Sequence, residues 1–140
     1  MRNLVTQLFN KANGTSVRYR TSPALGGAGV AGVVLTTGAG AWGAYADLIA
    51  AAAIATEFWV CGEGCYTVNG IQNFQFDVQN TTLTSVLFSW SADLTAVTPN
   101  IMPFMTPIPI YCAAGSQIQG RAGGAAAKTV NAYAIYAIGL

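Results

Sequence analysis

Apolar and polar side chains alternate with a period of two in several short segments, the pattern of half-buried β-strands. Residues 71–79 alternate most regularly, with Phe74, Phe76 and Val78 on the inward side and polar residues between them. Residues 83–90 repeat the pattern after an Asn-Thr-Thr turn signal. These two segments therefore predict two consecutive strands joined by a turn.

The last third of the chain, residues 107–140, reads as three strands separated by glycine-containing turns. Ile108, Ile110 and Cys112 would share one face of the first strand, because side chains alternate along a strand. The two prolines of this strand cannot donate ladder hydrogen bonds, so we expect it to be irregular or to lie at a sheet edge. The last strand, at 129–140, is apolar on both faces, which indicates a central strand covered on both sides.

Between residues 33 and 61 the pattern is less regular. A short strand is expected at 33–35, after a glycine-rich segment. The alanines at 50–53 favour helix by propensity. Alternation at 45–50 and the β-prone run at 57–61 instead favour two strands with a turn near the alanines, where a helical turn is the alternative.

Seven or eight short strands with frequent turn signals predict an all-β fold, an antiparallel two-sheet sandwich of jelly-roll-like form. The side chains expected in its core are Phe74, Phe76, Phe88, Ile110, Ile118 and Ile135. Residues 1–36 are expected to form an extended, basic, glycine-rich N-terminal arm, and residues 37–140 to form the sandwich domain.

The arm supplies the candidate interface with a partner. Ordering an extended segment costs about 1–2 kcal/mol per residue in backbone entropy, and this segment has few bulky apolar groups to offset that cost against its own domain. We therefore expect it to lie across neighbouring subunits, with its apolar residues buried and its arginines facing carboxylates. The candidate interface residues are Arg2, Leu4, Val5, Leu8, Phe9, Lys11, Arg18 and Arg20.

Charged residues make up only 8% of the chain, against about a quarter in typical domains. A large uncharged surface usually meets another protein, so we expect a homo-oligomer or a larger assembly. The basic residues are too few and too scattered to predict nucleic-acid binding. The chain has no histidine, and its five acidic residues fall in five separate segments. We therefore expect no catalytic residues, no enzyme activity and no cofactor.

The three cysteines, Cys61, Cys65 and Cys112, are odd in number and predict free, buried thiols in a reducing compartment rather than a disulfide framework. A zinc site would need all three cysteines and Glu63 as the fourth ligand, and we expect no metal. Glu63 lies between two glycines, a sequence typical of a solvated loop.

Residues 21–46 carry no charge and are long enough to span a membrane. Their seven glycines, among few bulky aliphatic residues, argue against insertion. We therefore expect no membrane association, with a small membrane-active protein such as a holin as the alternative. No basic segment leads an apolar one at the N-terminus, so no signal peptide is expected.

Five segments within residues 40–140 together resemble the β-sandwich structural proteins of tailed-bacteriophage virions. They are Gly-Ala-Trp-Gly-Ala-Tyr at 40–45, Pro-Ile-Pro-Ile at 107–110, Ala-Gly-Ser at 114–116, the small-residue strand Ile-Gln-Gly-Arg at 118–121, and the terminal strand at 129–140, which begins Thr-Val-Asn-Ala and ends Ile-Gly-Leu.

The resemblance implies a virion protein, assembled in the host cytoplasm, that brings no catalytic residues. Its role would be that of a capsid decoration (cement) protein, which binds major capsid subunits and stabilises the head, or of a head-to-tail component. A homotrimer is the oligomer implied first. The alternative is a tail, neck or fibre component that binds a receptor or a glycan. The aromatic residues that suggest this alternative also suit a sandwich core: Trp42, Trp59, Tyr66 and Trp90.

Overall fold

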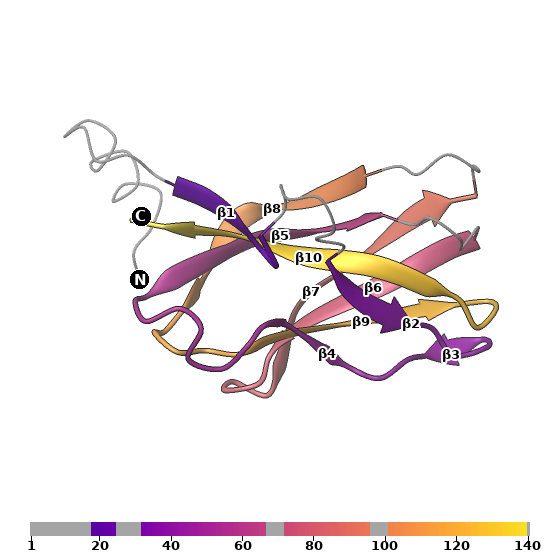
Figure 1. The fold of residues 1–140 in the computed structure, drawn as a ribbon, viewed down its shortest axis with the longest axis horizontal. Helices are drawn as coiled ribbons and strands as arrows, with labels where there is room; N and C mark the ends of the chain where they lie inside the picture. The colour runs from indigo at the N-terminus through magenta and orange to yellow at the C-terminus, as the bar shows by residue number, and fades with distance from the viewer. Residues whose placement is uncertain (1–17, 25–31, 67–71, 96–100, 140) are drawn as a thin grey trace.

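The computed structural model describes residues 18–24, 32–66, 72–95 and 101–139, and these form ten β-strands and no helix (Figure 1). The strands are β1 (Arg18–Ser22), β2 (Val33–Thr36), β3 (Ala41–Trp42), β4 (Ala46–Ile49), β5 (Phe58–Tyr66), β6 (Gln72–Asn80), β7 (Ser85–Leu94), β8 (Ile101–Cys112), β9 (Ile118–Gly124) and β10 (Thr129–Ile138). Every pair of named strands is antiparallel.

The strands form two sheets, called sheet A and sheet B below. Sheet A has the order β1-β10-β5-β8, with β2 also paired to β10, and sheet B has the order β3-β9-β6-β7, with β4 also paired to β9. The first strands of the chain pair with the last ones: β1 and β2 with β10, and β3 and β4 with β9. In the middle of the chain β5 pairs with β8 and β6 with β7, so the chain resembles one long hairpin that is folded over on itself. This is the connectivity of a jelly roll, and it confirms the expected antiparallel two-sheet sandwich.

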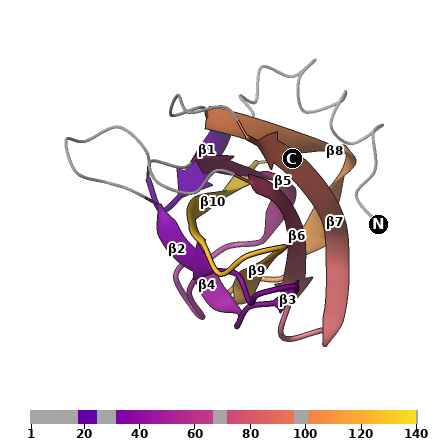
Figure 2. The same cartoon turned by 90° about the vertical axis from the view of Figure 1, so that its right-hand side faces the viewer.

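The two sheets approach each other along both sides of the sandwich. β7 meets β8 on one side, and β2 meets β4 and β9 on the other (Figure 2). On the first side, Phe104 of β8 stacks on Trp90 of β7 with ring centroids 5.4 Å apart, and Trp90 stacks on Phe76 at 4.6 Å. Aromatic rings therefore seal the side on which the two edge strands meet.

The core between the sheets only partly matches the expected one. Three of the six expected core residues are fully buried: Phe74, Phe76 and Ile118. The other three are half-buried: Phe88, Ile110 and Ile135. Phe88 and Ile110 belong to the edge strands, which are covered on fewer sides. Ile135 points away from the main core, into a second apolar cluster on the outer face of sheet A.

A β-bulge in β5 decides which side chains of this strand reach the core. Phe58 and Val60 face the core. Cys61 is then an extra residue, because its neighbours Val60 and Gly62 oppose consecutive residues of β10. The extra residue shifts the alternation by one position, so that Glu63 turns into the core instead of outward.

Glycine is required at the bulge because a Cβ on Gly62 would overlap the carbonyl oxygen of Phe104 in β8. Two residues further on, a Cβ on Gly64 would overlap the ring of Tyr133, which lies against the strand there. The Gly-Glu-Gly segment is therefore part of a buried strand, and the expectation of a solvated loop at Glu63 is wrong. Close approach of the neighbouring strands, rather than a turn, explains these glycines.

β8 is an edge strand of sheet A, as its prolines predict, and it is irregular where they lie. Residues 106–109 form a bulge of β8 between Met105 and Ile110, which pair with Gly62 and Val60, because proline has no N–H to continue the ladder. Ile108 lies in this bulge and is 76% exposed. Cys112 is buried, so the expectation that Ile108 and Cys112 share one face of the strand is wrong.

Two segments that the sequence assigns to the N-terminal arm are strands of sheet A. β1 pairs with residues 134–138 of β10, and β2 pairs with residues 129–132 of the same strand. The domain boundary expected after residue 36 thus falls inside the sandwich. β10 has ten residues, and without these two short strands the backbone groups along one of its edges would lack partners.

The segment at 33–61, whose sequence pattern is less regular, also folds largely as expected. The alternating segment at 45–50 contains β4, the run at 57–61 opens β5, and the alanines between them form a turn closed by a hydrogen bond from the amide of Ala53 to the carbonyl of Ala50 (3.1 Å). The uncharged segment at 21–46 contains β2 and β3. Within the described ranges, none of the chain forms a helix long and apolar enough to cross a membrane.

Replacing Gly62 with alanine tests the bulge. The new Cβ meets backbone, which cannot rotate away, so we expect a loss of more than about 3 kcal/mol in the free energy of unfolding. Gly40→Ala is the control, because a Cβ there meets open space and only the positive φ of 66° opposes it, at a cost of about 1–2 kcal/mol. Urea unfolding followed by circular dichroism measures both. An equal or smaller loss for Gly62→Ala would contradict the bulge geometry.

Candidate functional site

Most of the candidate interface residues of the arm lie outside the described residues: Arg2, Leu4, Val5, Leu8, Phe9 and Lys11. Arg18 and Arg20 lie in β1, where they pair with Ile138 and Tyr136 of β10. The side chain of Arg20 is exposed. Contact between the arm and neighbouring subunits stays a prediction.

The outer face of sheet A carries a row of apolar side chains that crosses all four strands of the main sheet order. The row is Tyr19, Ala137, Trp59 and Tyr111, residues that oppose one another from β1 to β8. The rings of Trp59 and Tyr111 meet edge to face, with centroids 5.7 Å apart. Trp59 is 2% exposed, whereas Tyr19 is 62% and Tyr111 49% exposed.

Apolar groups continue beside this row. Cys61 and Ile135 pack with Trp59, Tyr133 lies against Gly64, and Met105 is 50% exposed. We call this surface the apolar face; its residues are Tyr19, Trp59, Cys61, Gly64, Met105, Tyr111, Tyr133, Ile135 and Ala137. All of them are uncharged, so this part of the outer face is apolar, like the face of sheet A that covers the core.

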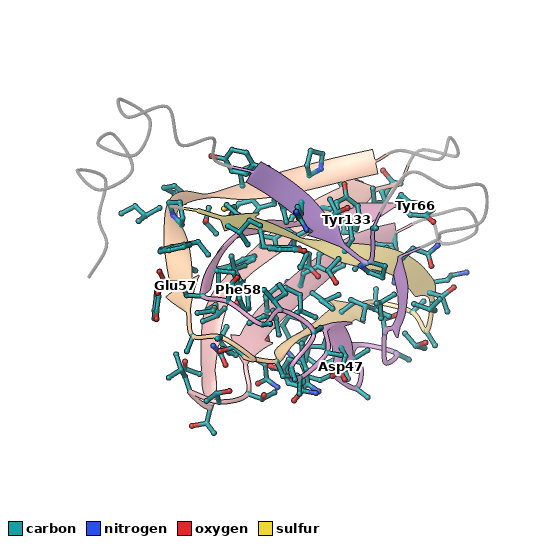
Figure 3. The ribbon with its side chains drawn as sticks, turned by 60° about the vertical axis from the view of Figure 1, so that its left-hand side comes forward. Asp47, Glu57, Phe58, Tyr66 and Tyr133 are labelled. Carbon is teal, nitrogen blue, oxygen red and sulfur yellow. The ribbon has the colours of Figure 1, made fainter. Side chains whose placement is uncertain are left out.

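The outer face of sheet B differs sharply in polarity. Its three rows, read across the strands by register, are Trp42, Gly123, Gln75 and Ser91; then Arg121, Asp77 and Ser89; then Asp47, Gln119, Gln79 and Val86. Val86, which is 50% exposed, is the apolar member of the third row. We call this surface the polar face. Figure 3 shows the two faces on opposite sides of the sandwich, with Tyr133 on the sheet A side, Asp47 on the sheet B side and Phe58 between them.

Arg121 lies at the centre of the polar face. Its Nε and Nη2 donate to Oδ2 of Asp77 at 3.0 and 2.7 Å, and the hydroxyl of Ser89 donates to the other carboxylate oxygen. The guanidinium carbon lies 4.6 Å from the ring centroids of both Trp42 and Tyr45. These contacts neutralise the charge of Asp77 and hold the indole of Trp42 in a fixed position.

A shallow hollow of about 250 Å³ lies beside Trp42. It is lined by Gly40, Ala41, Trp42, Gln75, Gly123, Gly124 and Ala125. A Cβ on Gly123 would come within 3.0 Å of the Trp42 ring, so this glycine lets the indole lie against β9 beside the hollow. Trp42 is 38% exposed, and Gln75, which also lines the hollow, is exposed as well.

Glu63 is a buried carboxyl group between the two sheets. It is 0% exposed, and its Oε2 accepts a hydrogen bond of 2.6 Å from the indole N–H of Trp90. Its Oε1 is buried without a hydrogen-bond partner among the described residues. Gly120 of sheet B makes room for this oxygen, because a Cβ there would lie 3.0 Å from it.

Burial raises the pKa of Glu63 to about 8, against a lowering effect of the Trp90 hydrogen bond and a further raising effect of the nearby charge of Asp77. The group is therefore mainly neutral at pH 7. A raised carboxyl pKa is common at catalytic sites. Here the carboxyl group is sealed inside the core, so no substrate reaches it in this conformation.

The three cysteines are free and buried, as the sequence predicts. Cys61 lies on the outer face of sheet A, whereas Cys65 and Cys112 lie in the core. The zinc alternative, which needs all three with Glu63, is wrong because the sheet separates the thiols. Burial raises the pKa of Cys61 to about 11 and that of Cys65 to about 12, so both remain protonated thiols.

Of the four aromatic residues considered for ligand binding, Trp59 is buried, Trp90 is half-buried against the core, Tyr66 is half-buried and Trp42 borders the hollow. Gln75, Asp77 and Arg121, which the register of β6 and β9 brings to one face, were not among the residues that the sequence indicated as a site. The outward positions of the alternation at 71–79 were the available signal for the first two.

Comparison with protein-family models, with curated proteins and with solved structures gives no match for the chain. The resemblance to virion proteins therefore rests on the sequence segments alone, and the site is interpreted from its own geometry.

The raised pKa of Glu63 predicts a specific pH dependence. The native state binds up to one more proton than the unfolded state between pH 4.5, the ordinary pKa of a glutamate carboxyl group, and about pH 8. The free energy of unfolding therefore falls as pH rises through this range, by up to about 1.4 kcal/mol per pH unit. Below pH 4.5 this contribution to stability is fully present.

Urea unfolding at intervals from pH 5 to pH 8 measures the slope. Glu63→Gln keeps the shape and the acceptor for Trp90 but cannot ionise, so its slope should be shallower by the amount that Glu63 contributes. Asp93→Asn is the control, because Asp93 is exposed and its replacement should leave the slope unchanged. Equal slopes for the wild type and Glu63→Gln would show that the carboxyl group is not held neutral by burial.

Proposed function

We propose that this chain is a non-enzymatic structural subunit of a virion, which docks onto major capsid subunits and stabilises the capsid as a decoration protein. The observation that carries the proposal is the apolar face of sheet A. A sheet with one face on its own core normally turns a polar face to water. This one instead presents exposed Tyr19, Met105 and Tyr111 around a floor of buried apolar groups.

Such a surface suits a protein partner better than a small molecule or a nucleic acid. It crosses four strands in register, and it carries aromatic side chains, which contribute strongly to protein interfaces. Its residues are uncharged, so they offer nothing to a phosphate backbone. Burying them would remove apolar area from water at about 25 cal/mol per Å².

The choice of a virion as the assembly has two supports. Residues 40–140 resemble the β-sandwich structural proteins of tailed-bacteriophage virions, and the jelly-roll connectivity is one that capsid subunits use. Because a fold does not by itself assign a function, the apolar face carries the proposal and the fold only agrees with it. The resemblance adds two further parts to the proposal. The chain self-associates as a trimer on the particle, and the particle is assembled in the host cytoplasm.

Charge substitutions on the apolar face test the docking. Met105→Glu and Tyr19→Glu each place a carboxylate on an exposed position, so the fold should be kept. An unpaired charge buried at an interface is costly, and we expect each variant to bind at least about tenfold more weakly. Co-sedimentation of the full chain with virus particles assembled without it measures the affinity.

Ser91→Glu is the matched control, since it adds the same charge at an exposed position on the polar face. Its binding should equal that of the wild type. Failure of the wild-type chain to co-sediment would refute the virion role. Equal losses for Ser91→Glu and Met105→Glu would instead show that the apolar face is not the docking surface.

A further inference from the structure

A polar outer face is usual for a sandwich, but the polar face of sheet B also has a hollow bordered by an exposed indole. Amide, hydroxyl, carboxylate and guanidinium groups stand in register across four strands, beside an exposed indole. Asp77 and Arg121 neutralise each other, so the centre of the face is rich in hydrogen-bonding groups but has little net charge.

We propose that the hollow between Trp42 and Gln75 is a binding site for a neutral sugar residue of a glycan. A pyranose ring has a face of C–H groups and a rim of hydroxyl groups. The C–H face packs on an aromatic ring, whose π face is electron-rich. The rim needs planar groups that both donate and accept hydrogen bonds, and the side-chain amide of Gln75 does both.

The arrangement of the hollow matches these two needs. Trp42 and Gln75 stand on either side of Gly123, with which both are in register. The indole itself lies over Gly123, because a Cβ there would come within 3.0 Å of its ring. The hollow beside it is lined by both Trp42 and Gln75, and Trp42 is 38% exposed, so a sugar ring in the hollow can contact both side chains. The volume of about 250 Å³ is below the range of about 300–1,000 Å³ of drug-sized pockets, which suits one sugar ring of a longer, solvent-exposed chain.

The site is held in place before any ligand arrives. Arg121 stacks on Trp42 at 4.6 Å and is itself fixed by Asp77, so the indole loses little freedom on binding, which favours affinity. The side-chain amides of Gln79 and Gln119, in the neighbouring row of the polar face, are already engaged in hydrogen bonds. Gln119 donates to Asp47 at 2.7 Å and accepts from Gln79 at 3.0 Å, so they bond to one another.

The charge balance selects the class of sugar. An acidic glycan, such as a sulfated one, would need unpaired cations, but Arg121 is already bonded to Asp77 through two nitrogens. Neutral hydroxyl-rich sugars need no such cation. The site also lies on the face of the sandwich opposite the apolar face, so the proposal stands independently of the virion role.

Titration of the full chain with short linear oligomers of glucose, mannose, galactose and N-acetylglucosamine, followed by nuclear magnetic resonance, tests the proposal, with heparin as the acidic comparison. We expect at least one neutral oligomer to bind more tightly than heparin. Trp42→Ala and Gln75→Ala should each weaken that binding by at least about tenfold. Tyr111→Ala is the matched control, because it removes an exposed ring from the apolar face, and it should bind like the wild type.

Gln75→Ala keeps the test decisive if Trp42→Ala does not fold, because Gln75 is exposed and outside the core. No binding of any of the four neutral oligomers at about millimolar concentration, or binding of heparin alone, would overturn the proposal. Binding that survives Gln75→Ala, or that is lost equally in Tyr111→Ala, would overturn it as well.

Discussion

The bulge at Cys61 and Gly62 in β5 is the constraint on which both faces of sheet A depend. β5 lies between β10 and β8, and one extra residue there exchanges the inward and outward positions along the rest of the strand. Before the bulge, Trp59 points outward and forms the floor of the apolar face. After it, Glu63 points inward. Gly62 permits the arrangement because the backbone of β8 passes too close for any side chain.

The inward turn of Glu63 ties the two sheets together. A carboxyl group in a core is costly unless it is neutral and hydrogen-bonded. Its raised pKa provides the first condition, and the indole of Trp90 in sheet B provides a hydrogen bond. Gly120, also in sheet B, leaves the space that the second oxygen occupies. Both partners come from the opposite sheet, so the position of Glu63 depends on how the sheets pack.

The two outer faces suit different kinds of partner because their side chains differ in polarity. The apolar face gains by removing aromatic and aliphatic surface from water, as protein docking does. The polar face has groups that exchange hydrogen bonds with hydroxyls, around an Arg121–Asp77 pair whose charges cancel. A chain docked through sheet A keeps sheet B turned to solvent, so the proposed capsid contact and the proposed glycan contact do not compete.

Local alternation is enough to predict the strand at 71–79 and the core positions of Phe74 and Phe76, because the direction of a side chain along a regular strand depends only on its neighbours in sequence. The prolines are enough to predict the edge strand. The strand expected at 83–90 is displaced, since residues 81–84 form a turn and β7 spans Ser85–Leu94. The orientation of Glu63 and the exposure of Ile108 were decided by the tertiary structure. Glu63 follows the bulge in β5, and Ile108 lies in the bulge of β8. At a bulge the inward and outward positions of the side chains exchange, and the pairing with the neighbouring strand decides where this happens. The Arg121–Asp77 pair likewise joins residues 44 positions apart, and only the pairing of β6 with β9 brings them together.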